Sequence, residues 1–264
     1  MPSNTSQAGA SQTSASQTSA TLGFERLPQQ GAVELLFLLF HGVGSTAAHM
    51  RPVADRLAAE YPQAAVIGVN APHPFDGVAG ASGHQWFSAT GVDDESRVRR
   101  VAQAMPAFVA TVRSQQQRFG LEWGRVALVG FSQGAIMSLE AVQAEPELAG
   151  RVLAFSGRYA VPPQHLPHDT TVHIFHGMAD RVLPFQSIAD CAERLVALGA
   201  DVTAEIEPGV GHELSTVLLD KAIEQLRTFL PKKVWREAFA EVPVLSRAAS
   251  SRELGSDVPR REIP

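Results

Sequence analysis

Ser132 lies in the segment GFSQGA, residues 130–135, between two apolar runs. A serine hydroxyl is a weak nucleophile unless a neighbouring base takes its proton. A sharp turn between a strand and a helix, with a glycine on each side, is one way to present such a hydroxyl to a substrate. The same serine could instead cap a helix in a glycine-rich loop. Because a Gly-x-Ser-x-Gly pattern also arises by chance, the rest of the chain must decide between the nucleophile and the helix cap.

The sequence on either side of Ser132 favours the nucleophile. Residues 126–129 form a continuous apolar run that predicts a strand, and residues 135–142 are almost wholly apolar, as expected of a helix buried under a sheet. Gly130 and Gly134 have no Cβ atom, so the strand and the helix can approach closely across the turn. A helix cap would account for the serine but not for the paired glycines. We therefore interpret Ser132 as a nucleophile.

Asp180 and His212 could complete a catalytic triad with Ser132. Asp180 follows an apolar run at 171–177, and His212 lies in a glycine-flanked loop after a weaker strand pattern at 201–207. The chain order serine, acid, histidine is that of one group of serine hydrolases. In such a triad His212 would take the serine proton, and Asp180 would fix the tautomer of the imidazole.

Each of these residues has another interpretation. Asp180, in the segment MADRVLP, could be a turn residue or a helix cap, and a single histidine in a glycine loop is more often structural. His41 and His176 also end predicted strands, but His41 comes too early in the chain to be the base. His176 lies close before Asp180, where it would pack or orient the loop. The joint order of the three residues favours the triad.

An acyl-transfer site also needs donors for the oxyanion of its tetrahedral intermediate. The backbone N–H of Gln133, directly after the serine, is one expected donor. The segment FHGVGS, residues 40–45, follows an early strand, and its glycines would let the backbone turn inward so that Val43 presents the second N–H. A plain tight turn is the alternative for this segment.

The strands and helices that must position these residues alternate along the chain. Consecutive apolar residues, typical of parallel strands covered on both faces, occur at 34–40, 64–70, 125–130, 151–156 and 171–177, and a weaker alternating run at 201–207. Apolar residues at helical spacing are Met50, Val53 and Leu57; Val98, Val101, Met105, Phe108 and Val112; Ile188, Cys191, Leu195 and Leu198; and Leu219, Ile223, Leu226 and Leu230. This pattern predicts an α/β fold, a mostly parallel central sheet with helices on both faces. Functional groups in such sheets belong at the carboxyl ends of the strands.

Composition limits the class of protein and its partners. The chain has 264 residues, of which 45% are hydrophobic, and a formal net charge of −5, which gives no reason to expect nucleic acid as a partner. Its one cysteine fits a reducing, cytoplasmic location, and no stretch is apolar enough to predict a membrane span. The polar, low-complexity segments 1–21 and 246–264 predict disordered tails around one domain at 22–245.

Several motifs together resemble one known family. The segments FHGVGS, QWFS, GFSQGAIMSLEA, FSGRYA, HGMADRVLP and GVGHEL, in this order, are similar to those of the carboxylesterase and acyl-protein thioesterase branch of the α/β-hydrolases. The resemblance covers about 34–240 and implies an α/β-hydrolase fold. It also implies Ser132, Asp180 and His212 as the triad and Val43 and Gln133 as the oxyanion donors.

Two departures from the family pattern affect the expected substrate. Thioesterase relatives usually read HGLGD and WFD, whereas Ser45 and Ser88 stand here in place of the acids. This difference weakens the transfer of protein-deacylating activity. In relatives the region around Trp86 and Phe87 lies beside the acyl pocket, so these residues are expected to bind substrate. Packing of the loop on the sheet is an equally good interpretation of them. Arg158 could meet an acidic group on a substrate or form a structural ion pair.

The sequence thus predicts a carboxylesterase-type serine hydrolase that forms an acyl-enzyme. The expected substrate is a small-molecule ester of short or medium acyl chain, with thioesters accessible to the same chemistry. No metal or other cofactor is expected, and the protein is expected to be a monomer or homodimer. An acyl-protein thioesterase or lysophospholipase-like enzyme is the alternative within the fold. A non-catalytic binding module on the same fold is the alternative from another class.

Overall fold

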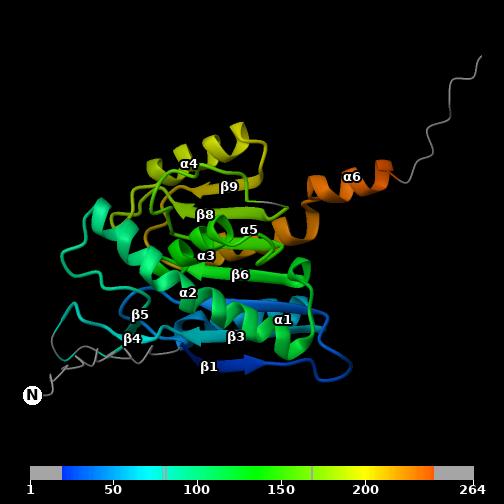
Figure 1. Ribbon diagram of the computed structural model, residues 1–264, viewed down its shortest axis with the longest axis horizontal. Coiled ribbons are helices and arrows are strands. Elements are labelled where there is room, and N and C mark those ends of the chain that lie inside the picture. Colours follow the sequence, from blue (N-terminus) through cyan, green and yellow to red (C-terminus); the bar gives the residue numbers. More distant parts are fainter. Residues whose placement is uncertain (1–19, 79, 81, 168, 241–264) are drawn as a thin grey trace, which may run out of the picture. The chain divides into compact units, whose positions relative to one another are not determined.

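The computed structural model describes residues 20–78, 80, 82–167 and 169–240, and the first compact unit of the chain extends to Phe229. Its centre is a seven-stranded sheet in the order β1-β3-β2-β6-β7-β8-β9 (Figure 1). Its strands are β1 (Thr21–Arg26), β2 (Leu35–Phe40), β3 (Ala64–Asn70), β6 (Val126–Phe131), β7 (Arg151–Phe155), β8 (Thr171–Gly177) and β9 (Asp201–Glu207). All neighbours pair in parallel except β1, which runs antiparallel to β3 at the edge. The predicted α/β fold with a mostly parallel sheet is confirmed.

Helices cover both faces of the sheet (Figure 1). They are α1 (Arg51–Glu60), α2 (Asp94–Phe119), α3 (Gln133–Ala144), α4 (Gln186–Ala197) and α5 (Thr216–Thr228). The central strand β2 shows how the core is divided, because successive side chains point to opposite faces. Leu36 and Leu38 lie in the core with α2, α3 and α4, and Phe37 and Leu39 in the core with α1 and α5. Burial of consecutive apolar residues on both faces is the reason that these strands show no alternation.

The structure adds elements that the sequence did not predict. Strand β1 begins at Thr21, the last residue of the predicted tail, and buries only Phe24 among its side chains, so it carries little apolar pattern. A two-stranded ribbon pairs β4 (His73–Pro74) with β5 (His84–Gln85) and is too short to be recognised by periodicity. Val98 and Leu198, expected on buried helical faces, are 37% and 38% exposed.

The residues from Leu230 onward form a second compact unit, in which the described helix is α6 (Lys232–Ala240). Residues 1–19 of the predicted N-terminal tail and the whole of 246–264 lie outside the described residues, as does the predicted domain boundary at 245. The disordered tails and the domain boundary at 245 therefore stay predictions. None of the helices in the described part of the chain is long and apolar enough to cross a membrane.

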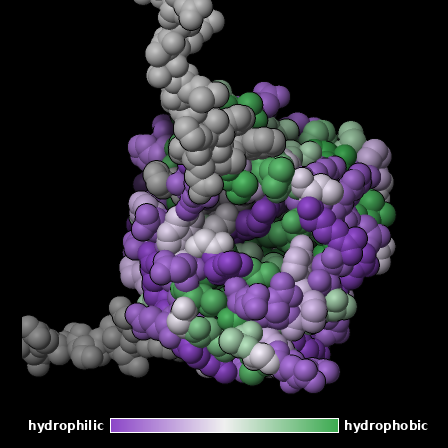
Figure 2. Space-filling view, turned by 90° about the vertical axis from the view of Figure 1, so that its right-hand side faces the viewer, coloured by the Kyte–Doolittle hydropathy of each residue, from purple (hydrophilic) through white to green (hydrophobic). Residues whose placement is uncertain are grey.

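Figure 2 faces the edge of the sheet where the parallel strands begin and shows hydrophobic atoms gathered in a hollow between hydrophilic ones. A small cavity of about 190 Å³ at this edge lies between the first residues of β2 and β6 and is bordered by Tyr61, Arg151 and Leu226. Ser132, Asp180 and their loops follow the other ends of the strands. The two edges of the sheet are therefore chemically distinct, and the candidate site lies at the carboxyl edge.

His173 on β8 is a fully buried histidine that the fold holds in the neutral form. Arg151 donates from Nη1 to His173 Nε2 at 2.9 Å, and Nδ1 lies 2.9 Å from the hydroxyl of Thr203. Because Arg can only donate, Nε2 must be the acceptor and the proton is on Nδ1. Burial, and then the charge of Arg151, lowers the pKa of His173 to about 3.

This lowered pKa predicts loss of stability in acid. An unfolded histidine has a pKa near 6.5, so below that pH the unfolded chain binds a proton that folded His173 does not. Its contribution is complete above about pH 6.5 and is lost as the pH falls toward the folded value. We expect about 2–3 kcal/mol of the free energy of unfolding to be lost through this residue between pH 7 and pH 4.5. Urea denaturation of His173→Gln should show a smaller loss over that interval, and identical pH dependence in both proteins would contradict the assignment.

Candidate active site

Ser132 occupies a tight turn between β6 and α3. Its φ of 51° and ψ of −116° are unfavourable for a residue with a side chain. The turn closes because two neighbours are glycines. A Cβ atom at Gly134 would collide with the carbonyl oxygen of Phe40, and one at Gly130 would collide with the backbone of Ala135. The structure thus shows the close approach of strand and helix across this turn that the two glycines predicted.

His212 lies between Ser132 and Asp180. Its Nε2 is 2.9 Å from Ser132 Oγ, and its Nδ1 is 2.7 Å from Asp180 Oδ2. An ionised carboxylate only accepts, so the proton of the neutral imidazole belongs on Nδ1 and leaves Nε2 to accept the serine proton. The ring of His212 also packs on Phe131 with centroids 5.1 Å apart. The structure therefore brings the three predicted triad residues into a continuous hydrogen-bonded chain.

The carboxylate of Asp180 is held from several sides. The backbone N–H groups of Val182 and Leu183 each donate to Oδ1 at 2.8 Å, while His212 Nδ1 donates to Oδ2. Burial alone would raise the pKa of Asp180, but these hydrogen bonds outweigh it and lower the pKa below its usual value. Asp180 is therefore an ionised carboxylate held in one orientation. It does more than the turn residue that the sequence analysis gave as an alternative.

His176 supports the same loop. Its Nε2 lies 2.8 Å from the carbonyl oxygen of Leu183 and 3.2 Å from Asp180 Oδ2. Both neighbours are acceptors, so the proton belongs on Nε2, and burial lowers the pKa of His176. The orienting role expected for His176 thus fits its contacts.

The loop after β2 lies beside the nucleophile. A Cβ atom built at Gly42 would lie 3.2 Å from Ser132 Cβ, so the backbone of this loop passes the serine closely. The N–H of Gly44 is already bonded to the carbonyl oxygen of His84 at 2.9 Å. Val43, partly exposed, precedes Gly44.

Gln133 is the first residue of α3, and an N–H in the first turn of a helix has no acceptor within the helix. Gln133 therefore follows Ser132 directly and Val43 follows Gly42, whose backbone passes the serine; the role of their N–H groups as oxyanion donors stays a prediction.

The side chain of Gln133 joins this helix to the loop that contains Trp86 and Phe87. Its Oε1 accepts from the N–H of Trp86 at 2.8 Å, and its Nε2 donates to the carbonyl oxygen of Phe87 at 2.8 Å. The indole N–H of Trp86 donates to the carbonyl oxygen of His41 at 2.9 Å. Trp86 thus links the two segments that carry Val43 and Gln133, a role that no sequence pattern indicated.

The side chains of Trp86 and Phe87 are buried, 2% and 6% exposed. The indole packs edge-on against Phe40 and Phe108 in the core under α2. These contacts support the packing interpretation. The two residues also border a cavity of about 590 Å³, so their role in substrate binding stays a prediction. Arg158 forms an ion pair with Asp94 at 2.8 Å, in agreement with the interpretation of this arginine as part of a structural ion pair.

His41 fixes the start of the same loop. Its Nδ1 lies 2.7 Å from the carbonyl oxygen of Gly42, and its Nε2 accepts from the N–H of Ala71 at 3.0 Å. Burial lowers the pKa of His41 to about 4, so the ring is neutral at physiological pH. His41 is therefore a positioning residue. Among the described residues, no group of histidine, cysteine and carboxylate side chains could hold a metal ion.

Known proteins are similar to this chain in sequence and in fold. The family profile described as Phospholipase/Carboxylesterase matches residues 27–230. Esterase YpfH of Escherichia coli (strain K12) is 40% identical over 213 residues, which cover 81% of this chain and 90% of that protein. Acyl-protein thioesterase 1 of Eremothecium gossypii is 27% identical over 215 residues, which cover 74% of this chain and 87% of that protein. The crystal structure of esterase PE8 superposes with a TM-score of 0.70 at 29% identity, covering 79% of this chain and 99% of that one.

The link through Trp86 can be tested by Trp86→Phe, which keeps an aromatic ring beside Phe40 and Phe108 but removes the donor to His41. Because a buried carbonyl then loses its partner, we expect the free energy of unfolding to fall by about 1–2 kcal/mol in urea denaturation. An unchanged free energy of unfolding in Trp86→Phe would contradict a structural role for the indole N–H.

Proposed function

The chain belongs to the phospholipase/carboxylesterase family, and from this premise we propose that Ser132, His212 and Asp180 hydrolyse carboxylic esters through an acyl-enzyme. The observation that carries the proposal is the hydrogen-bonded chain from Ser132 Oγ through His212 to Asp180. The chain is a serine hydrolase by family, with esterases among its relatives. The residue roles are inferred from geometry.

In the first step, His212 Nε2 takes the proton of Ser132 as Oγ attacks the carbonyl carbon of the ester. The negative charge that develops on the carbonyl oxygen is stabilised by the N–H groups of Val43 and Gln133. His212 then gives the proton to the departing alcohol oxygen, and the acyl group remains on Ser132. Asp180 stabilises the imidazolium throughout without itself taking a proton.

In the second step, water takes the place of the alcohol. His212 removes a proton from that water, the resulting hydroxide attacks the acyl carbon, and the same oxyanion donors hold the second tetrahedral intermediate. Its collapse returns the proton to Ser132 Oγ and releases the carboxylic acid. All proton transfers use side chains of this chain, so the proposed reaction requires no cofactor.

The proposed substrate is a small-molecule ester of short or medium acyl chain. A thioester would undergo the same steps with a thiol as the leaving group. The relative that is 40% identical is an esterase, and acyl-protein thioesterases are less identical to this chain. We therefore place oxygen esters first. A cytoplasmic location, suggested by the one free cysteine, Cys191, belongs to the same proposal.

Release of p-nitrophenol from p-nitrophenyl acetate by Ser132→Ala tests the nucleophile. Without Oγ no acyl-enzyme can form, so kcat/KM should fall by at least about 10³-fold. Ser138→Ala, at a buried serine on α3, is the control and should stay within about threefold of the wild type. Circular dichroism checks that both variants fold. Wild-type rates in a folded Ser132→Ala would refute the proposal and favour a non-catalytic binding module.

Asp180→Asn tests the anion behind His212. The amide cannot hold the Nδ1–H tautomer or stabilise the imidazolium, so we expect kcat to fall by about 10²- to 10⁴-fold. Asp220→Asn, at an exposed aspartate paired with Arg56, is the control and should leave kcat unchanged. A kcat within tenfold of the wild type in Asp180→Asn would show that another group orients His212.

A further inference from the structure

The side chains of His49 and Phe131, together the aromatic corner, lie beside His212. Their ring centroids are 5.3 Å apart, and the ring planes meet at 71°. The ring of Phe131 also packs on the ring of His212, with centroids 5.1 Å apart. Phe131 is only 6% exposed, whereas His49 is exposed to solvent. His49 is therefore the outer wall of the aromatic corner, and Phe131 joins it to the triad.

We propose that the aromatic corner binds the alcohol part of the ester and favours an aromatic alcohol. The inference rests on the proposed ester hydrolysis, and it adds where the departing alcohol is held and to which chemical class it belongs. Two rings that meet at a steep angle let a third flat ring lie face-on to one and edge-on to the other. Both are arrangements that aromatic pairs prefer.

The proton that the alcohol needs determines where the alcohol lies. His212 Nε2 takes the proton of Ser132 and gives it to the alcohol oxygen as the bond between that oxygen and the acyl carbon breaks. This oxygen must therefore lie within about 3 Å of Nε2 as it leaves. A benzyl group extends about 6 Å from the oxygen, and side chains in contact with it lie about 4 Å further out. An alcohol of this size held at His212 therefore reaches the rings packed around Phe131.

The loop after β2 brings His49 to this place. A Cβ atom at Gly42, near the start of the loop, would lie 3.1 Å from Phe131 Cδ1 and 3.2 Å from Ser132 Cβ. The loop then enters the short 3-10 helix η1 (Ala47–Met50), whose first and last residues are buried in the core with α1 and α5. His49 belongs to this helix, and its ring returns to Phe131. The proposed oxyanion donor of this loop and the aromatic corner are therefore parts of one anchored segment.

The imidazole of His49 is not used to hold the fold together. His41, His173 and His176 each form hydrogen bonds with the surrounding chain through a ring nitrogen. The ring nitrogens of His49 form no hydrogen bond with the residues that the structure describes. Partial desolvation lowers the pKa of His49, so its ring is neutral at physiological pH. The exposed wall of the aromatic corner is thus a flat, uncharged surface, which suits a neutral aromatic alcohol.

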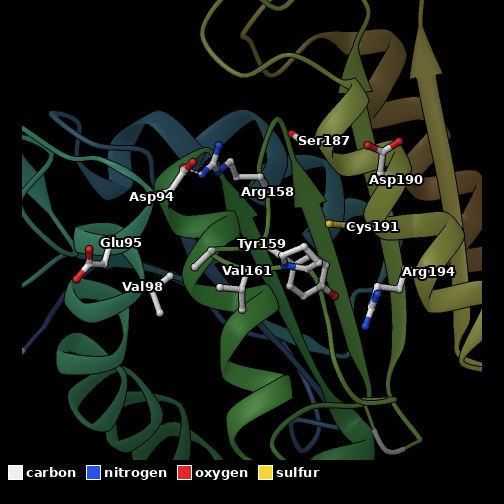
Figure 3. A pocket seen from close by; sticks show the side chains of 12 residues that line it. Asp94, Glu95, Val98, Arg158, Tyr159, Val161, Ser187, Asp190, Cys191 and Arg194 are labelled. Atoms are coloured by element: carbon white, nitrogen blue, oxygen red, sulfur yellow. Dashed lines mark hydrogen bonds and ion pairs between the residues drawn. The ribbon is translucent and has the colours of Figure 1, made fainter.

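The aromatic corner is separate from two hollows of the described surface. A groove of about 660 Å³ between α2 and α4 is lined by Arg158 and Asp94, whose ion pair Figure 3 shows. A cavity of about 590 Å³ lies beside Trp86. Neither hollow is lined by His49, Phe131 or a residue of the triad. Because the alcohol must stay beside the base that protonates it, neither hollow is its site.

Two acetates that differ only in the ring of their alcohol test the aromatic corner. Benzyl acetate and cyclohexylmethyl acetate give the same acyl-enzyme, and both alcohols are primary and similar in size. Because kcat/KM reports the step in which the alcohol leaves, the ratio of the two values isolates the contact with a flat ring. We expect the wild type to favour benzyl acetate and His49→Ala to reduce this preference by about threefold to tenfold.

Two further variants serve as controls. His49→Phe keeps a flat ring at the same position and should retain the preference for benzyl acetate. His165→Ala removes an exposed histidine from the loop after β7 and should leave both values of kcat/KM within about twofold of the wild type. Circular dichroism checks that all three variants fold.

The outcomes separate this inference from the proposed function. If His49→Ala lowers kcat/KM for both esters by the same factor, its ring only supports Phe131, so the inference is refuted while ester hydrolysis stands. A wild type that does not distinguish the two esters, or an unchanged ratio in His49→Ala, refutes the inference in the same way. If the wild type hydrolyses no ester, p-nitrophenyl acetate included, the proposed function and the aromatic corner fail together.

Discussion

The close packing of α3 against the ends of β2 and β6 is the constraint on which the site depends. Only glycine fits at 130 and 134, because any Cβ atom there would meet the backbone of Ala135 or Phe40. This packing holds Ser132 in its unfavourable φ and ψ. Its hydroxyl is therefore presented at the turn, where the first turn of α3 also begins. The strain is local, and burial of β6 and α3 in the core offsets it.

Gln133 connects the nucleophile to the rest of the sheet edge. Its backbone N–H is one proposed oxyanion donor, while its side chain holds the backbone of Trp86 and Phe87. Trp86 in turn bonds to His41, at the start of the loop that carries Val43. The spacing of the segments that carry the two proposed donors is therefore fixed by buried hydrogen bonds. Such preorganisation is the source of oxyanion stabilisation in an acyl-transfer enzyme.

The sequence predicted the parts of this arrangement that leave a local pattern. Consecutive apolar residues predicted the buried parallel strands, and the order of Ser132, Asp180 and His212 predicted which residues meet at the carboxyl edge. Strand β1 escaped prediction because a short edge strand buries only one side chain. The burial of Trp86 depends on how α2 packs over the sheet, and no single segment of the sequence records that packing. Trp86 was therefore as compatible with a substrate pocket as with the core, and its role in substrate binding stays a prediction.

The measurement that tests the central claim most directly is identification of the covalent intermediate. The wild-type protein would be mixed rapidly with p-nitrophenyl acetate, quenched in acid within the first turnover, digested and analysed by mass spectrometry. The account predicts a single acetyl group on the peptide that contains Ser132, and none on that peptide from Ser132→Ala. Turnover of the ester with the acetyl group on another residue, or with no acyl-protein at any quench time, would contradict the account.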